Sequence, residues 1–141
     1  MAGELALTSG RKPPAAVVSA VQALALSGEP TVGAAGFVTL GKFCIGSAEL
    51  TKRLAPMFIH ELTSHELVVV RNNALVVIFD LVKHHAAALD RHIAAIALAV
   101  CDAAPLVRQQ AIVLLTQLLL EDYVKWRPPL FRAFCVALVD A

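Results

Sequence analysis

An internal repeat constrains this chain more than any other feature of its sequence. Nine residues that begin at Val70, Val-Arg-Asn-Asn-Ala-Leu-Val-Val-Ile, align with Val-Arg-Gln-Gln-Ala-Ile-Val-Leu-Leu beginning at Val107, at an offset of 37 residues. A weaker copy begins at Val32, 38 residues before the first. Self-similarity at a period of about 20–50 residues indicates a stack of similar units, in which each unit buries its apolar face against its neighbours.

The spacing of apolar residues predicts that these units are helical. Between residues 66 and 85 the apolar residues follow one another at steps of three and four, which places them on one helix face. The strict alternation of a half-buried strand is scarce, so we expect an all-α fold. The expected helices span residues 13–27, 31–45, 48–63, 66–85, 88–101, 104–121 and 128–140.

Two helices in a period near 40 residues are typical of HEAT-type repeats. The sequence therefore predicts a right-handed α-solenoid of about three HEAT-like helix pairs over residues 13–141. Residues 1–12 should form a flexible leader. The excess of apolar residues has two explanations, a surface buried against partners or a piece of a longer protein, because a complete solenoid carries polar caps at its ends.

Helix packing and charge pairing can explain the residue types of the repeated Val-Arg-x-x-Ala motif. Its small residue allows close packing between helices, and its arginines lie one repeat apart, where they can pair with acidic groups of neighbouring units. The residues to which we assign a structural role in the repeat are Val70, Arg71, Asn72, Asn73, Ala74, Val107, Arg108 and Ala111.

Composition excludes several classes of protein. Apolar residues make up 58% of the chain and charged residues 16%, against about 25% charged in an ordinary soluble domain. Such a chain can bury enough apolar surface to fold, so disorder is excluded. A formal charge of +1 argues against a polyelectrolyte binder of nucleic acid. The longest uncharged stretch, residues 13–28, is too short and too polar for a membrane-spanning helix, which needs about 20 apolar residues.

The three cysteines are an odd number, widely spaced, and each lies in an apolar run. This pattern predicts buried free thiols in a reducing compartment rather than disulfides. The cysteines are Cys44, Cys101 and Cys135.

No motif for catalysis or for a cofactor is apparent. His84, His85 and His92 lack the spacing of metal ligands and are expected at exposed helix ends. There is no nucleophile elbow, paired-carboxylate spacing or glycine-rich phosphate loop. We therefore expect no enzymatic activity, no cofactor, no metal and no small-molecule substrate.

Two basic clusters are candidate contacts with nucleic acid or with a partner. Lys52 and Arg53 lie near the start of a predicted helix, and Lys125, Trp126 and Arg127 follow an acidic pair in a predicted loop. A tryptophan between cations can stack on a base while the cations bind phosphate. The alternative, which we favour, is that Trp126 packs on its own loop and the charges are solvated.

Three sequence stretches carry a resemblance to a known family. They are Phe-Val-Thr-Leu-Gly-Lys-Phe-Cys at residues 37–44, Val-Arg-Asn-Asn at residues 70–73 and Leu-Leu-Leu-Glu-Asp-Tyr-Val-Lys-Trp-Arg at residues 118–127. In the same order, these stretches resemble the C-terminal HEAT region of the D-type non-SMC subunits of condensin. Within that family, the Glu-Asp-Tyr-Val-Lys-Trp stretch is most similar to condensin II members.

The resemblance implies a non-enzymatic regulatory or scaffold segment, a fragment of a longer chain, that acts in mitotic chromosome condensation. It implies a kleisin and the SMC ATPases as partners, a nuclear and chromosomal location, and contact with DNA as an option; no membrane is expected. The alternative is a generic HEAT-repeat adaptor in trafficking or signalling, without chromatin association.

Overall fold

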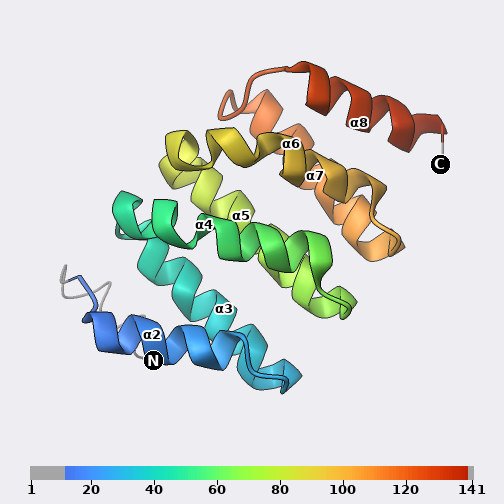
Figure 1. The fold of residues 1–141 in the computed structure, drawn as a ribbon. Coiled ribbons are helices and arrows are strands. Elements are labelled where there is room, and N and C mark those ends of the chain that lie inside the picture. Colours follow the sequence, from blue (N-terminus) through green and yellow to red (C-terminus); the bar gives the residue numbers. More distant parts are fainter. Residues whose placement is uncertain (1–11, 140–141) are drawn as a thin grey trace.

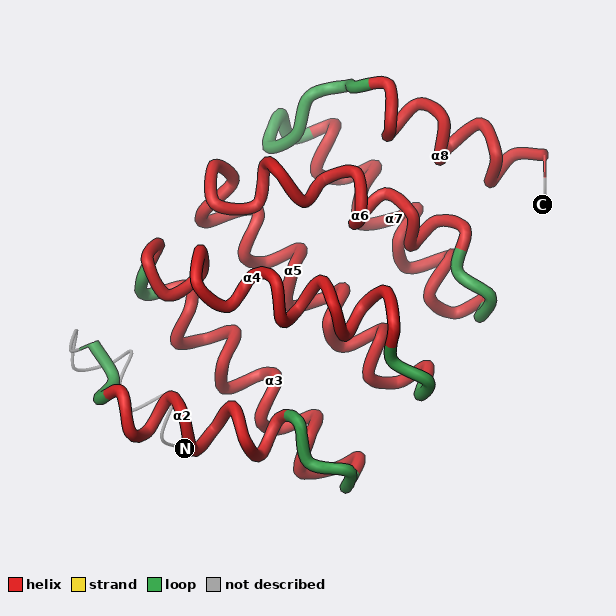
Figure 2. The backbone as a smooth tube through the Cα atoms, viewed as in Figure 1, coloured by secondary structure: helices red, strands yellow, loops and turns green. Residues whose placement is uncertain are grey.

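A computed structural model describes residues 12–139 of the chain. Apart from Lys12, the expected leader lies outside the described residues. The described residues form helices joined by short loops, without a strand among them (Figure 2), so the all-α prediction is confirmed. The elements are α2 (Ala15–Ala25), α3 (Pro30–Ile45), α4 (Ala48–Ser64), α5 (Val68–Leu89), η1 (Asp90–His92), α6 (Ile93–Ala97), η2 (Leu98–Cys101), α7 (Pro105–Leu120) and α8 (Pro128–Val139).

The helices are arranged in space in the order in which they follow along the chain. Helix α2 packs on α3, α4 packs on α5, and the segment formed by α6 and η2 packs on α7 and α8. Helices α3, α5 and α7 also contact one another in succession. Figure 1 shows this order as a colour sequence that runs from blue α2 at one end of the molecule to red α8 at the other.

Local sequence explains where several helices begin. The Ser47 hydroxyl accepts a hydrogen bond from the Leu50 N–H at 3.2 Å, which caps the start of α4 as expected for serine at this position. Pro105 occupies the first turn of α7, where its missing N–H leaves no hydrogen bond unmade.

Two predicted helices differ from the structure. The helix predicted over residues 88–101 is a short α6 flanked by the 3₁₀ segments η1 and η2. Helix α5 extends to Leu89 but contains a non-helical residue, His85, at φ −139° and ψ 51°. The His85 ring donates a hydrogen bond from Nε2 to the carbonyl of Ile45 at 2.9 Å. It thus supplies a partner to one of the last carbonyls of α3, which have no partner within their own helix. His85 is therefore half-buried and not at an exposed helix end, which corrects the prediction for this residue.

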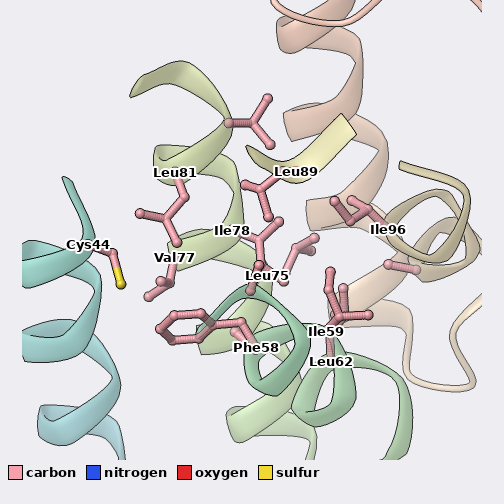
Figure 3. Close-up of a cluster of buried hydrophobic side chains, with 14 of the residues drawn as sticks. Cys44, Phe58, Ile59, Leu62, Leu75, Val77, Ile78, Leu81, Leu89 and Ile96 are labelled. Atoms are coloured by element: carbon pink, nitrogen blue, oxygen red, sulfur yellow. The ribbon is translucent and has the colours of Figure 1, made fainter. Parts of the chain in front are cut away.

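A continuous apolar core connects successive helices. Figure 3 shows its central part, where Phe58 of α4 lies close to Leu75 and Ile78 of α5, with Ile96 of α6 on the far side. These side chains are 2% exposed or less. The core supplies the apolar packing that a helix pair cannot complete alone.

The small residue of the repeat lies at a close approach between helices. Gly36, Ala74 and Ala111 occupy this position in α3, α5 and α7, and the two alanines are fully buried. A Cβ added to Gly36 would lie 2.5 Å from the backbone nitrogen of Ala25 in α2. The first copy of the repeat therefore requires glycine here, since α2 and α3 leave no room for a methyl group.

The prediction of three buried thiols is only partly correct. Cys44 is buried, whereas Cys101 and Cys135 are exposed, and all three are free. Cys135 lies on the face of α8 away from the buried Leu130 and Ala133, so apolar neighbours in sequence did not mean burial in space. Among the helices of residues 12–139, none has the length and apolar character needed to cross a membrane.

Candidate partner interface

The repeat arginine of α5 is held by four hydrogen bonds. The Arg71 guanidinium forms a bidentate pair with Asp102, with Nε–Oδ2 at 2.8 Å and Nη2–Oδ1 at 2.9 Å. Its Nη1 donates to the carbonyls of His65 and Glu66 at 2.7 and 3.0 Å, which lie in the turn before α5. Arg71 thus joins its own turn to the turn before α7. The pairing with an acidic group that the sequence predicted for both repeat arginines is found for Arg71, whereas Arg108 forms no ion pair with another of residues 12–139.

The arginine one repeat later makes the same contacts with its own turn. Nη1 of Arg108 donates to the carbonyls of Asp102 and Ala103 at 2.8 and 2.9 Å. These two residues lie 37 positions after the carbonyl partners of Arg71, which is the sequence offset of the repeat. The same contact therefore recurs in both repeats: the arginine of the motif donates two hydrogen bonds to carbonyls of the turn before its own helix.

Asp102 is the residue through which adjacent turns are joined, and sequence reasoning did not identify it. Burial acts to raise its pKa, but the hydrogen bonds from Arg71 and from the Ala104 N–H, together with the charges of Arg71 and Arg108, outweigh burial and hold the pKa below its ordinary value. His65 holds the position equivalent to Asp102 in the preceding turn. Its ring Nδ1 accepts a hydrogen bond from the Leu67 N–H at 3.0 Å, just as Asp102 accepts one from the Ala104 N–H. The sequence carries no signal that singles out Asp102, because the equivalent position of the preceding repeat is His65 and not an acid.

The candidate basic residues in the loop between α7 and α8 are largely engaged within the molecule. The Arg127 guanidinium forms a bidentate pair with Asp90, and this hydrogen bonding raises the Arg127 pKa. The Trp126 ring lies 5.6 Å from the Phe134 ring of α8, although its side chain remains 61% exposed. Lys125, which precedes Trp126, is exposed. Arg127 is thus held by an ion pair, and Trp126 packs against α8 and not on its own loop, so neither matches the favoured alternative in detail. Trp126 and Lys125 remain accessible to a partner.

A second ion pair fixes the end of α7. Lys83 of α5 contacts the Glu121 carboxylate at 2.8 Å, and its ammonium lies 5.3 Å from the Phe79 ring centre and 5.4 Å from the Tyr123 ring centre. These contacts order the start of the loop that carries the candidate residues.

The other candidate cations, Lys52 and Arg53, are exposed on α4. The two clusters therefore lie on different elements, one on α4 and the other in the loop between α7 and α8. The two adjacent side chains differ in their surroundings, since Arg53 lines a hollow at the start of α4 and Lys52 does not.

An apolar stripe on the stacked helices was missed by sequence reasoning. Val38, Val76 and Val113 occupy equivalent repeat positions on α3, α5 and α7 and are 50%, 37% and 61% exposed. Val69 and Leu106 form a second equivalent pair and are 56% and 54% exposed. Because α3, α5 and α7 contact one another in succession, we call the surface formed by these five side chains the apolar stripe.

The described residues offer no set of metal ligands. No group of three or more His, Cys, Asp or Glu side chains within residues 12–139 is arranged to hold a metal ion.

Comparisons with known proteins connect this architecture to one group of relatives. The chain is 41% identical over 110 residues to Condensin-2 complex subunit D3 of Mus musculus, 38% over 109 residues to Condensin-2 complex subunit D3-L of Xenopus laevis, and 36% over 111 residues to Condensin-2 complex subunit CAP-D3 of Arabidopsis thaliana. These alignments cover 77–79% of this chain and 7–8% of the length of each relative.

No protein-family model matches the chain. No solved structure matches it either. With this identity to relatives from a mammal, an amphibian and a plant, the chain is homologous, over more than three quarters of its length, to a short segment of the D3 subunit of condensin-2.

Proposed function

We propose that this chain is a non-enzymatic scaffold segment of a condensin II-like complex that acts in mitotic chromosome condensation. The observation that carries the proposal is its 36–41% identity to condensin-2 D3 subunits over about four fifths of its length. In this proposal the chain works with SMC ATPases and a kleisin on chromosomes in the nucleus, and ATP hydrolysis belongs to the SMC partners.

The architecture proposed for this role is a right-handed α-solenoid of HEAT-like helix pairs over residues 13–141. Three features support it: the helices are ordered in space as in sequence, the arginine contact recurs at the repeat offset, and the small residue of each repeat is buried. A stack of this kind presents an extended surface to a partner.

We place the kleisin contact on the apolar stripe. The stripe crosses three successive helices, and such a surface suits an extended peptide whose apolar side chains cover it. Trp126 is a candidate flanking anchor, because exposed tryptophans often contribute strongly to protein interfaces. DNA contact remains part of the proposal through Lys52, Arg53 and Lys125, whereas Arg127 is held by Asp90.

The first test is a pulldown of the tagged chain from dividing cells followed by mass spectrometry. Recovery of SMC ATPases and a kleisin is the expected result. Recovery of trafficking or kinase-scaffold proteins without condensin subunits would instead support the alternative, a generic HEAT-repeat adaptor.

The stripe itself is tested with a charged variant, Val76→Asp with Val113→Asp. We expect loss of the kleisin with an unchanged helical circular dichroism spectrum. Leu26→Asp is the matched control, since Leu26 is 50% exposed but lies outside the stripe. Equal loss of the kleisin in both variants would contradict placement of the contact on the stripe.

A further inference from the structure

Two cationic side chains, Lys12 and Arg53, line a small hollow between the starts of α2 and α4. It has a volume of about 200 Å³, and its lining includes Lys12 and Val18 on one side and Ser47, Glu49 and Arg53 on the other. Residues about 35 positions apart in sequence thus meet at one site on the first two helix pairs.

The two cations of the hollow are not neutralised by the residues around them. Neither the Lys12 ammonium nor the Arg53 guanidinium has a hydrogen bond or ion pair with another described residue. Glu49 is the single carboxylate in the lining, and it forms no ion pair with Arg53 among the described contacts. The hollow therefore has two cationic side chains against one anionic side chain.

The backbone adds to this charge. Helix α2 begins after Pro14 with no side-chain cap and no acidic residue in its first turn, and its first residue, Ala15, lines the hollow, so the partial positive charge of this helix end lies at the hollow. The start of α4, in contrast, is already capped by Ser47. The side chains carry the argument, and the end of α2 reinforces it.

We propose that this hollow binds the phosphoryl group of a phosphoserine or phosphothreonine in a partner segment. A phosphomonoester concentrates about −1.5 to −2 charges in one group, which matches an isolated pair of cations. An arginine fork can donate two parallel hydrogen bonds to its oxygens. This site is independent of the kleisin contact on the apolar stripe.

Duplex DNA is the less suitable ligand for this hollow, so we assign Arg53 to the phosphoryl group and leave Lys52 and Lys125 as the proposed DNA contacts. A protein that binds the duplex backbone tightly contacts about 6–10 phosphates with a row of cations. Here the next cation along α4, Lys52, does not line the hollow, and the whole chain carries a formal charge of +1. The hollow therefore suits a single phosphate group and not the row of phosphates along a duplex.

The test is fluorescence anisotropy of the full chain with a labelled degenerate phosphothreonine peptide library, its unphosphorylated counterpart and a labelled 20-base-pair duplex. We expect the phosphorylated library to bind at least tenfold more tightly than the unphosphorylated one. Arg53→Ala should weaken that binding at least tenfold. Lys52→Ala, which removes the same charge from the adjacent exposed residue, should change it less than twofold.

A third variant tests the role of the carboxylate. Glu49→Gln should tighten phosphopeptide binding several-fold, because it removes the only anionic group of the lining. The proposal is overturned if the unphosphorylated library binds equally well, if Lys52→Ala and Arg53→Ala weaken binding equally, or if the duplex competes more effectively than the phosphopeptides. Circular dichroism of each variant establishes that a loss of binding is not a loss of folding.

Discussion

Replacement of Arg71 by methionine tests the contact that joins adjacent turns. Methionine keeps an apolar stem but removes all four hydrogen bonds of the guanidinium. The side chains of Arg71 and Asp102 are only 12% and 11% exposed, so the variant leaves a nearly buried carboxylate without its cation. Breaking a buried ion pair in this way costs about 3–5 kcal/mol.

The lower end of that range is expected here. Asp102 retains the hydrogen bond from the Ala104 N–H and the nearby charge of Arg108, so we expect a loss of about 3 kcal/mol in the free energy of unfolding. For a chain of this size that corresponds to roughly 10 °C in Tm. Arg108→Met is the matched control, because Arg108 donates hydrogen bonds to two carbonyls and to no carboxylate among the described residues, and their loss should cost about 1–2 kcal/mol.

Urea unfolding followed by circular dichroism at several pH values measures both effects. The pKa of Asp102 is held below its ordinary value in the folded chain, so the pair contributes stability above about pH 4 and loses it as the pH falls through the folded-state pKa. The difference between wild type and Arg71→Met should therefore shrink in acid. A double-mutant cycle with Asp102→Asn should give a coupling of about 1–3 kcal/mol. Equal losses in the Arg71 and Arg108 variants, or a coupling near zero, would refute the reasoning.

Gly36→Ala should lower the free energy of unfolding by about 1–3 kcal/mol, because its Cβ would lie 2.5 Å from the backbone nitrogen of Ala25; an unchanged urea midpoint would contradict the close approach. Burial raises the pKa of the Cys44 thiol to about 12, so at pH 8 a thiol reagent should label the two exposed cysteines quickly and Cys44 only on unfolding. Three equally fast reactions would show that Cys44 is accessible. Arg127→Ala should leave affinity for duplex DNA within twofold of wild type in a gel shift, because Asp90 already holds the guanidinium; a tenfold loss would make Arg127 a DNA contact.

The elements that could be predicted from the sequence are those fixed by local spacing or by the repeat. Ser47 as a helix cap, the start of α7 at Pro105 and the pairing of Arg71 with a neighbouring acid all follow from residue type and register. The acid itself, Asp102, could not be singled out, because one aspartate in a polar turn has no distinguishing spacing. Its role depends on a residue 31 positions away.

What could not be predicted depends on contacts distant in sequence or on the direction of a side chain. The break at His85 is stabilised by the carbonyl of Ile45, 40 residues earlier. Lys52 and Arg53 look equivalent in sequence, yet successive side chains of a helix point about 100° apart, and only Arg53 reaches the hollow. The apolar stripe was overlooked because its members are separated by 37 or 38 residues and resemble core positions.

The placement of helices in chain order has a consequence for how the protein acquires its structure. Helices pack on partners one or two α-helices away in the chain, as α3 does on α5 and α6 does on α8, so few long loops must close before packing begins. Chains rich in such local contacts fold in about microseconds to milliseconds. Each pair can therefore pack as it leaves the ribosome, and the turn closed by Arg71 is completed only when Asp102, 31 residues later, has been synthesised.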